Sequence, residues 1–296
     1  MKPNLVPVTA VILNWNRPHD TISCMRSLQA NNYPSLEILI VDNGSTDNST
    51  TIIQHAFPEV TLLINEDNLG YAAGNNLGIA HALQGNAAYV LVMNNDTIIA
   101  DDGISELVKA ATCFPGAGAL VPKIYHASDP TRIWAAGARW APFPPRVKLI
   151  GFNAPDTPQF DRACELEYAT GCVWLLSRDA LEVLNGFDPG YFMYQEDYDF
   201  CYRLRAAGFT IRYVPSAHIW HQVSAGLGFL SSKWWYHWSR SVVRFYRVEN
   251  RFPMRWLGSF VVWVLMRELV KGNMRFLPSY VRGLRDGWRA LGAPGA

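Results

Sequence analysis

Four short, largely apolar runs, each followed at once by asparagine or aspartate, constrain the fold of this chain more than any other feature. They cover residues 8–13, 36–41, 60–64 and 89–93. A continuous apolar run of this length is typical of a strand buried on both faces, as in the middle of a parallel sheet. The segments between the runs have helical spacing and short turns, which predicts strand–helix–strand units. We therefore expect an α/β fold, with a mainly parallel central sheet flanked by helices.

The polar residues at the strand ends predict a binding site. Asn14, Asp42, Asn65 and Asn94 directly follow the four runs. In open α/β sheets, ligands bind in the crevice beyond the carboxyl ends of the strands. Asp96 comes just after the fourth run, so its carboxylate is well placed to hold a metal ion. The alternative is that Asp96 only caps the helix that starts near Asp101.

The chemistry of these strand ends favours a nucleotide. Asp42 can accept a hydrogen bond from a base N–H, and the asparagines can bind ribose hydroxyls, while glycines let the backbone approach closely. Turn chemistry alone would also explain residues 42–45. No Gly-x-Gly-x-x-Gly follows the first strand and no Gly-Lys-Ser/Thr loop occurs, which disfavours a hydride-transfer enzyme or a P-loop ATPase. The expected nucleotide contacts are Asn14, Asn16, Asp42, Asn68, Gly70, Gly74 and Asn94.

A metal site is expected next to the nucleotide. A departing nucleotide diphosphate needs its charge neutralised, commonly by Mg²⁺ or Mn²⁺ held by one or two carboxylates and phosphate oxygens. Asp96 supplies one carboxylate, and His221 is a candidate second ligand. A histidine beside tryptophan is otherwise often a packed core residue.

The acidic cluster at residues 196–199 is the candidate catalytic element. Acidic residues are favoured in the first turn of a helix by its dipole, so the cluster has a purely structural explanation as well. The preceding segment, 186–194, is rich in glycine and aromatic residues, like the wall of a sugar-binding site. A carboxylate beside such a wall can deprotonate an acceptor hydroxyl as a general base.

Four motifs together carry a specific resemblance. They are VDNGSTD (41–47), NLGYAAGNN (68–76), NNDT (94–97) and GFDPGYFMYQEDYDFCYR (186–203). They occur in the order found in family-2 glycosyltransferases of the GT-A fold, and the match extends over residues 6–225. The chain most resembles the bacterial rhamnosyltransferase-like branch, which builds cell-surface polysaccharides.

The resemblance implies an inverting transfer of a sugar, with rhamnose as one candidate, from a nucleotide-diphospho-sugar to a saccharide or lipid-linked acceptor. It implies a divalent metal, Mg or Mn, at an Asp-x-Asp-like motif, which here reads Asn94-Asn95-Asp96 and keeps only the last carboxylate. Its Glu-Asp pair falls on Glu196 and Asp197, which makes Asp197 the expected base. Its His-x-x-Ser element is similar to residues 221–224. For the acceptor or sugar we expect contacts from Gly171, Tyr194 and Arg203.

The chain divides into two regions of opposite charge. Residues 1–229, the expected GT-A domain, carry 14 Lys and Arg against 22 Asp and Glu, whereas residues 230–296 carry 12 against 3. This C-terminal region also holds six of the eleven tryptophans. We expect it to form a basic, Trp-rich, amphipathic helical extension.

The extension is expected to contact a membrane without crossing it. Its most apolar run, residues 256–266, is shorter than the ~20 residues that span a bilayer and suits an interfacial helix. Its arginines at three- and four-residue steps predict one basic helix face. The alternative is a helical pair packed on the main domain with a solvated basic face. No nucleic-acid-binding module accompanies the charge, so a nucleic-acid partner is disfavoured. The arginines are Arg240, Arg244, Arg247, Arg251 and Arg255.

The remaining expectations concern location and partners. The five cysteines are odd in number and lack paired metal spacing, and the N-terminus has no signal-peptide run, which favours buried thiols in the cytoplasm. We expect a peripheral enzyme at the inner face of the cell membrane that uses a dTDP-, UDP- or GDP-sugar. The alternative, a catalytically silent nucleotide-sugar-binding or membrane scaffold protein, is supported by the depleted metal motif and opposed by the intact Glu196-Asp197 pair.

Overall fold

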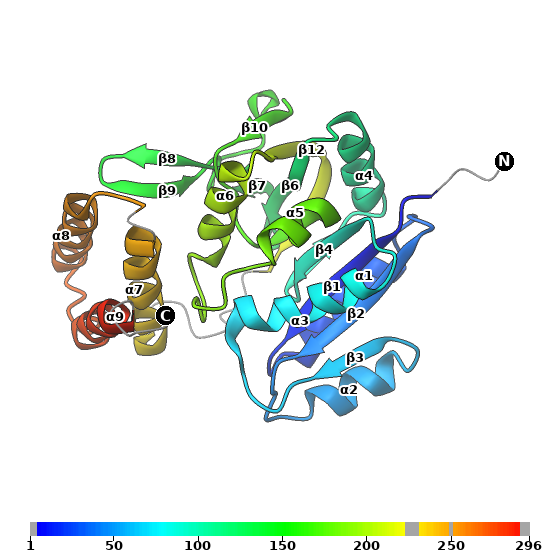
Figure 1. The fold of residues 1–296 in the computed structure, drawn as a ribbon, viewed down its shortest axis with the longest axis horizontal. Helices are drawn as coiled ribbons and strands as arrows, with labels where there is room; N and C mark the ends of the chain where they lie inside the picture. Colours follow the sequence, from blue (N-terminus) through cyan, green and yellow to red (C-terminus); the bar gives the residue numbers. More distant parts are fainter. Residues whose placement is uncertain (1–4, 223–230, 249–250, 291–296) are drawn as a thin grey trace.

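The computed structural model of the chain describes residues 5–222, 231–248 and 251–290. Figure 1 shows a twisted central sheet with helices on both faces. Three C-terminal helices lie beside a protruding hairpin (Figure 1): the helices are α7 (Ser232–Arg247), α8 (Met254–Val270) and α9 (Leu277–Ala290), and the hairpin is formed by β8 (Ala138–Pro142) and β9 (Pro145–Leu149). The α/β fold predicted from the apolar runs is confirmed, and the extension is helical.

The first half of the sheet is parallel, as its sequence pattern predicts. Strand β1 pairs in parallel with both β2 and β4, and β2 pairs in parallel with β3. Three of the strands, β1, β2 and β4, end on the polar residue that follows the apolar run. The elements of this half are β1 (Val8–Asn14), α1 (Pro18–Gln29), β2 (Leu36–Asp42), α2 (Ser49–Ala56), β3 (Thr61–Ile64), α3 (Gly70–Gln84) and β4 (Tyr89–Asn94).

Alternate residues of these strands enter two cores, one on each face of the sheet. On β4, Val90 and Val92 join the cluster that contains Ile79 of α3. Leu91 and Met93 of the same strand join a second cluster with residues of α1 and α4 (Gly103–Cys113). Because neighbouring side chains of a strand point to opposite faces, a strand covered on both faces must be apolar throughout. This explains why the runs are continuous rather than alternating.

The second half of the sheet is mixed. Strand β11 is antiparallel to both of its neighbours, β4 and β6, while β12 runs parallel to β6. The beginning of β11 therefore meets the end of β4, and the end of β12 pairs with β5. The elements of this half are β5 (Thr97–Ile99), α4 (Gly103–Cys113), β6 (Ala117–His126), β7 (Asp129–Ala135), β8 (Ala138–Pro142), β9 (Pro145–Leu149), η1 (Pro158–Phe160), β10 (Cys164–Leu166), β11 (Val173–Ser177), α5 (Arg178–Leu184), α6 (Glu196–Ala206) and β12 (Thr210–His221).

The C-terminal helices are packed into the main core. Helix α7 spans Ser232–Arg247, α8 spans Met254–Val270 and α9 spans Leu277–Ala290. Trp235 and Phe260 from these helices belong to the same buried cluster as Trp174 and Phe200 of the sheet domain. The extension is thus continuous with the apolar core on one face of the sheet.

Two tail arginines bind the main domain instead of forming a solvent-facing row. The guanidinium of Arg244 lies 2.8 Å from the carboxylate of Asp188, and that of Arg251 lies 2.8 Å from Asp199. The side chain of Arg251 is fully buried. The predicted single helix face that joins Arg240 to Arg255 is therefore wrong, because α7 ends at Arg247 and two of the five arginines point inward.

Two smaller expectations also have an outcome. All five cysteines are free, but Cys113 and Cys164 are exposed, so the prediction of buried thiols holds only for Cys24, Cys172 and Cys201. Among the described residues, none of the helices combines the length and hydropathy that a membrane crossing requires.

Candidate active site

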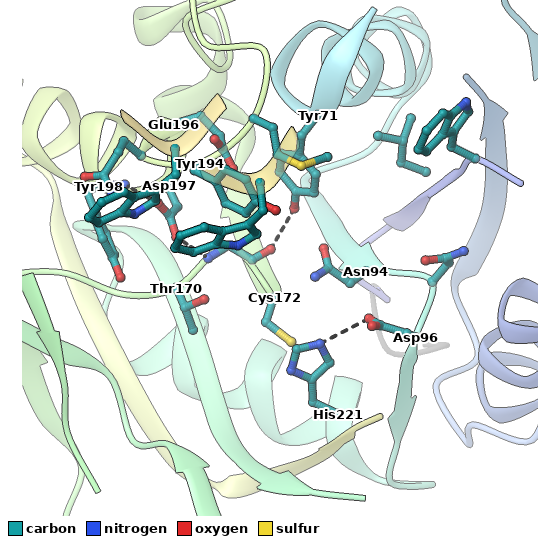
Figure 2. A pocket seen from close by; sticks show the side chains of 18 of the residues that line it. Tyr71, Asn94, Asp96, Thr170, Cys172, Tyr194, Glu196, Asp197, Tyr198 and His221 are labelled. Atoms are coloured by element: carbon teal, nitrogen blue, oxygen red, sulfur yellow. Dashed lines mark hydrogen bonds and ion pairs between the residues drawn. The ribbon is translucent and has the colours of Figure 1, made fainter. Parts of the chain in front are cut away.

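A cavity of about 550 Å³ lies at the polar edge of the sheet. Its wall is built from the end of β4, the residues just before β11, the end of β12, and helices α6 and α7. Figure 2 shows Asn94 and Asp96 on one side of this cavity and Tyr194, Glu196 and Asp197 on the other. The mixed sheet therefore brings the predicted metal ligands and the predicted base to one space.

Asp96 and His221 meet at the floor of the cavity (Figure 2). The Nε2 atom of His221 lies 3.2 Å from Oδ1 of Asp96, and both side chains are buried. The contact follows from the topology, because His221 ends β12 opposite Thr97, one residue after Asp96. The two predicted metal ligands are thus neighbours, although 125 residues separate them in the chain.

The surroundings of His221 favour its charged form. Burial lowers its pKa, but the sulfur of Cys172 and the carboxylate of Asp96 raise it, and the balance brings the pKa to about 10. The pKa of Cys172 is itself raised by burial. Without a bound cation, His221 and Asp96 therefore form an ion pair, which keeps a buried carboxylate neutralised.

Asp197 is fixed by backbone hydrogen bonds at the start of α6. Its Oδ2 accepts from the N–H of Gly171 at 3.1 Å, and its Oδ1 accepts from the N–H of Tyr198 at 2.8 Å. The hydroxyl of Tyr71 donates to the carbonyl of Gly171 at 2.7 Å, which ties the same loop to α3. The carboxylate is therefore held against the cavity wall in a defined orientation.

Burial sets the protonation of the acidic pair. It raises the pKa of Asp197 to about 6, while the N–H groups of Gly171 and Tyr198 oppose the rise. Burial and then the charge of Asp197 raise the pKa of Glu196 well above its ordinary value. Because the pKa of Glu196 is raised further than that of Asp197, Asp197 is the member of the pair that gives up its proton first. A carboxylate with a pKa near 6 is suited to take a proton from a hydroxyl in the transition state.

A strained turn precedes the acidic pair. Tyr194 and Gln195 have φ angles of 70° and 69°, a left-handed conformation that non-glycine residues rarely adopt. Such backbone persists only when the surrounding structure over-determines it, and it clusters at functional sites. The turn ends in the first residue of α6, so it sets the direction from which Glu196 and Asp197 enter the cavity.

Several predicted nucleotide residues bond to one another at the ends of β1 and β2. Asn14 donates to Asp42 Oδ2 at 2.7 Å, and both the N–H and the hydroxyl of Ser45 donate to the same carboxylate. Asn16 accepts from the N–H of Thr46 at 2.8 Å. Asn14 and Asp42 are buried, so their observed role is to hold the loops after β1 and β2 together.

The other predicted nucleotide residues have varied positions. Asn94 lines the main cavity, and Asn68 lines a smaller cavity of about 360 Å³ that shares Trp15 with it. Gly70 and Gly74 are explained by packing. A Cβ on Gly70 would lie 2.2 Å from the carbonyl oxygen of Phe192, and one on Gly74 would lie 2.7 Å from a methyl carbon of Leu13.

The predicted acceptor residues divide in the same way. Gly171 and Tyr194 line the main cavity, but Arg203 does not. Arg203 donates to Asp199 at 2.6 Å and to the carbonyl oxygen of Gly186. It thereby supports the segment that leads to the strained turn. Of the predicted His-x-x-Ser element, residues 223 and 224 lie outside the described residues.

Sequence reasoning missed several side chains in the cavity wall. Trp134 contacts the ring of His221 edge-on, with 4.5 Å between ring centroids. Trp234 and Trp238 enter from α7, and Cys172 and Arg17 complete parts of the wall. The three tryptophans had no motif to mark them, since their position depends on how the tail and the β7 region fold back.

Comparison with known proteins identifies the family of the chain. The sequence model described as "Glycosyl transferase family 2" matches residues 9–184, and that of the "N-terminal domain of galactosyltransferase" matches residues 156–223. The chain is 32% identical over 245 residues to N-acetylglucosaminyl-diphospho-decaprenol L-rhamnosyltransferase of Mycobacterium tuberculosis, covering 76% of this chain and 78% of that protein. It is 25% identical to the low-salt glycan biosynthesis hexosyltransferase Agl10 of Haloferax volcanii, covering 69% of this chain and 63% of that one.

Solved structures show the same fold. GalNAc-T7 with UDP, GalNAc and Mn²⁺ superposes with a TM-score of 0.64 at 18% identity, over 83% of this chain and 48% of that one. The mannosyltransferase PcManGT of Pyrobaculum calidifontis, in complex with GDP-Man and Mn²⁺, gives 0.59 at 18% identity, over 99% and 78%. The fold is that of the GT-A glycosyltransferases, as predicted. The chain belongs to glycosyltransferase family 2, in its rhamnosyltransferase-like branch, and is thus an enzyme and not the silent binding protein considered above.

Proposed function

We propose that this enzyme transfers a sugar, with rhamnose as the first candidate, from a nucleotide-diphospho-sugar to a lipid-linked saccharide in cell-surface polysaccharide synthesis. One observation carries the proposal: Asp197 faces the same cavity as the Asp96–His221 pair. In this proposal Asp197 is the general base, and the Asp96–His221 pair is the site that binds the diphosphate and its counterion. The mycobacterial relative supports the choice of sugar and acceptor, since its name specifies L-rhamnose and a lipid-linked N-acetylglucosamine.

The proposed reaction is a single displacement. The acceptor hydroxyl lies against Asp197, which takes its proton as the oxygen attacks the anomeric carbon of the donor sugar. The bond between that carbon and the diphosphate oxygen breaks on the opposite face, and the electron pair leaves with the nucleoside diphosphate. Attack from the face opposite the leaving group inverts the anomeric configuration. The hydrogen bonds from Gly171 and Tyr198 keep the base oriented throughout.

Asp96 and His221 are the residues that would hold a divalent ion. Their facing atoms are 3.2 Å apart. Adjacent ligands of an octahedral ion with bonds of about 2.1 Å lie about 3 Å apart, so the pair fits one edge of such a shell. Within the described residues, no group of three or more acidic, His or Cys side chains forms a complete metal cage. When bound, the ion would neutralise the charge that develops on the diphosphate, whose oxygens would complete the shell.

The nucleotide is proposed to extend from Asn94 past Trp15 toward Asn68. Trp15 lines both cavities, which makes it the link between the diphosphate end and a base or ribose end. The role of Asn14, Asn16 and Asp42 would then be to hold the adjoining loops in shape. Asp42 would also accept a hydrogen bond from the nucleobase. In this proposal, the residues around the Asn68 cavity determine whether the enzyme selects a dTDP-, UDP- or GDP-sugar.

The tail is proposed to rest on the inner face of the cell membrane, through α8 and not through the predicted arginine row. The outward face of α8 exposes Met254, Val262, Met266 and Leu269, each by 46–59%. Its inward face buries Leu257, Phe260, Val264 and, near the end of the helix, Glu268. A contiguous apolar patch that stays exposed on such a helix is typical of a contact surface. Exposed cations lie at the start of α8 and just beyond its end and suit anionic lipid: Arg255, Lys271 and Arg275.

The replacement Asp197→Asn tests the proposed reaction. It removes the base and changes little volume, so transfer is expected to fall about 10²–10⁴-fold while nucleotide affinity stays the same. Transfer from a panel of dTDP-, UDP- and GDP-sugars with Mn²⁺ is the measurement. The control is Asp179→Asn, which changes an exposed carboxylate on α5. Transfer within threefold of the wild-type rate would remove Asp197 from the mechanism.

A further inference from the structure

Three aromatic side chains form a continuous wall on the Asp197 side of the cavity. We call Tyr194, Trp234 and Trp238 the aromatic wall; all three line the cavity. The rings of Tyr194 and Trp234 are 5.6 Å apart, and those of Trp234 and Trp238 are stacked at 5.3 Å with 16° between their planes. Two of the three members come from α7, which lies in the C-terminal extension.

The wall is held in place by polar contacts that the reaction does not use. The hydroxyl of Ser241 on α7 donates to the carbonyl oxygen of Met193 at 2.8 Å. Arg244, one turn further along, donates to both carboxylate oxygens of Asp188 at 2.9 and 3.0 Å. These contacts fix α7 to the segment that ends in the strained turn at Tyr194. The tryptophans and the catalytic carboxylate thus share one rigid support.

The position of the wall identifies the part of the reaction that it serves. Asn94 and Asp96 stand on the opposite side of the cavity from Tyr194 and Asp197 (Figure 2). The donor diphosphate belongs beside Asp96, and the group that loses a proton belongs beside Asp197. A ring seated on the wall is therefore the acceptor and not the donor nucleotide.

The chemistry of the wall fits a pyranose. The C–H face of a sugar ring packs against flat aromatic rings, while its hydroxyls at the rim keep polar partners. Trp238 also contacts Phe260 of α8, with 5.7 Å between ring centroids, so the wall adjoins the helix proposed to face the lipid. We propose that the aromatic wall is the binding subsite for the acceptor's sugar ring, and that α7 is therefore part of the active site. This inference rests on the proposed function.

Acceptor kinetics test the subsite. The probe is a water-soluble alkyl diphosphate that carries N-acetylglucosamine. For Trp234→Ala we expect a KM for this acceptor at least tenfold higher, with nucleotide affinity and slow donor hydrolysis by water within twofold of wild type. Trp234→Phe keeps an aromatic face and is expected to restore most of the loss. The control is Trp288→Ala, since Trp288 is a half-exposed tail tryptophan on α9 outside the cavity wall.

Two outcomes would overturn the assignment. An acceptor KM within twofold of wild type for Trp234→Ala would show that the wall does not touch the acceptor. An equal loss of nucleotide affinity would place the wall under the nucleobase. Equilibrium binding of the same probe without donor, in wild type and Trp234→Ala, gives the answer even where no transfer is seen. Failure of the proposed reaction and failure of the subsite therefore remain distinguishable.

Discussion

The N-terminal sheet and the C-terminal helices obey the same physical rules but differ in how their sequences could be interpreted. In the sheet, burial on both faces allows only one pattern, and the polar strand ends mark the site edge. In the tail, a basic and aromatic helix fits either a membrane or a protein core. The structure shows both kinds of surroundings: α7 packs against the protein core, whereas α8 exposes an apolar face. The pattern of apolar and polar residues is thus most informative where only one kind of environment, such as a protein core on both faces, fits the segment.

The buried ion pair between tail and sheet domain offers the strongest test of this contrast. The side chain of Arg251 is fully buried, 2.8 Å from Asp199, and its guanidinium lies 4.1 Å from the ring centre of Tyr202. Arg251→Met removes the charge and leaves Asp199 with Arg203 as its cation. We expect a loss of about 2 kcal/mol in the free energy of unfolding, since one buried oxygen of Asp199 loses its charged partner while Arg203 keeps the other. Denaturant unfolding followed by circular dichroism measures it.

The matched control for this ion pair is Arg255→Met, which removes an exposed arginine at the start of α8. Its effect should stay within about 0.5 kcal/mol, as for most surface substitutions. Equal stability of the two variants would mean that the tail is only loosely attached, and the contrast between α7 and α8 would fail.

The pH dependence tests the sheet edge without altering the chain. Burial raises the pKa of Asp197 to about 6, and the base must be ionised to accept a proton. We therefore expect kcat/KM to fall about tenfold per pH unit below pH 6 and to level off above it. Glu196, Tyr71 and Tyr198 face the same carboxylate, and burial raises the pKa of each of them well above its ordinary value.

The control for the pH profile is the residual rate of Asp197→Asn, which should show no inflection near pH 6. A wild-type profile that stays flat down to pH 4 would mean that Asp197 is solvated and that the sheet edge is more open than the structure shows.

The weakest expected effect concerns the exposed face of α8. Met266→Glu replaces a half-exposed apolar side chain by a charge. We expect vesicle binding to weaken about tenfold, because burial of a methionine contributes roughly 1.5–3 kcal/mol and anionic lipid repels glutamate. Sedimentation with phosphatidylglycerol vesicles measures it, and binding of the wild type should fall with added salt.

Val183→Glu is the matched control for α8, since Val183 is 64% exposed on α5 in the sheet domain. It should leave vesicle binding unchanged. Unaltered binding by Met266→Glu, or dimerisation of the wild type that this change abolishes, would show that a second copy and not lipid covers the face.

These differences explain how far the sequence could predict the molecule. The first four strands were predicted within one residue at each end. Continuous apolar runs bounded by turn residues define where each strand begins and ends. Asp96 and Asp197 could be named from their motifs, and the cavity includes both. The antiparallel insertion of β11 could not be predicted, since nothing local in a short apolar run fixes its direction.

The positions of several residues depend on long-range pairing that the sequence does not reveal. His221 reaches Asp96 only because β12 pairs with β5. Trp234 reaches Tyr194 only because α7 folds back onto α6. In the sequence, Arg251 resembles the other four arginines of the predicted basic face. Its side chain is buried because it pairs with Asp199, which lies inside the main domain. The charge and spacing of residues predict the helix or strand to which a residue belongs. They do not predict its contact partner, which depends on how elements distant in the sequence pack together.

The division of one cavity between early and late parts of the chain has a consequence for synthesis. Chains grow from the N-terminus at about 5–20 residues per second, so on the order of 10 s separates the appearance of Asp96 from that of Trp234. During that interval Asp197 and His221 are made as well, and both line the same cavity as Asp96 and Trp234. The cavity is therefore complete only after α7 has been synthesised and has packed against α6.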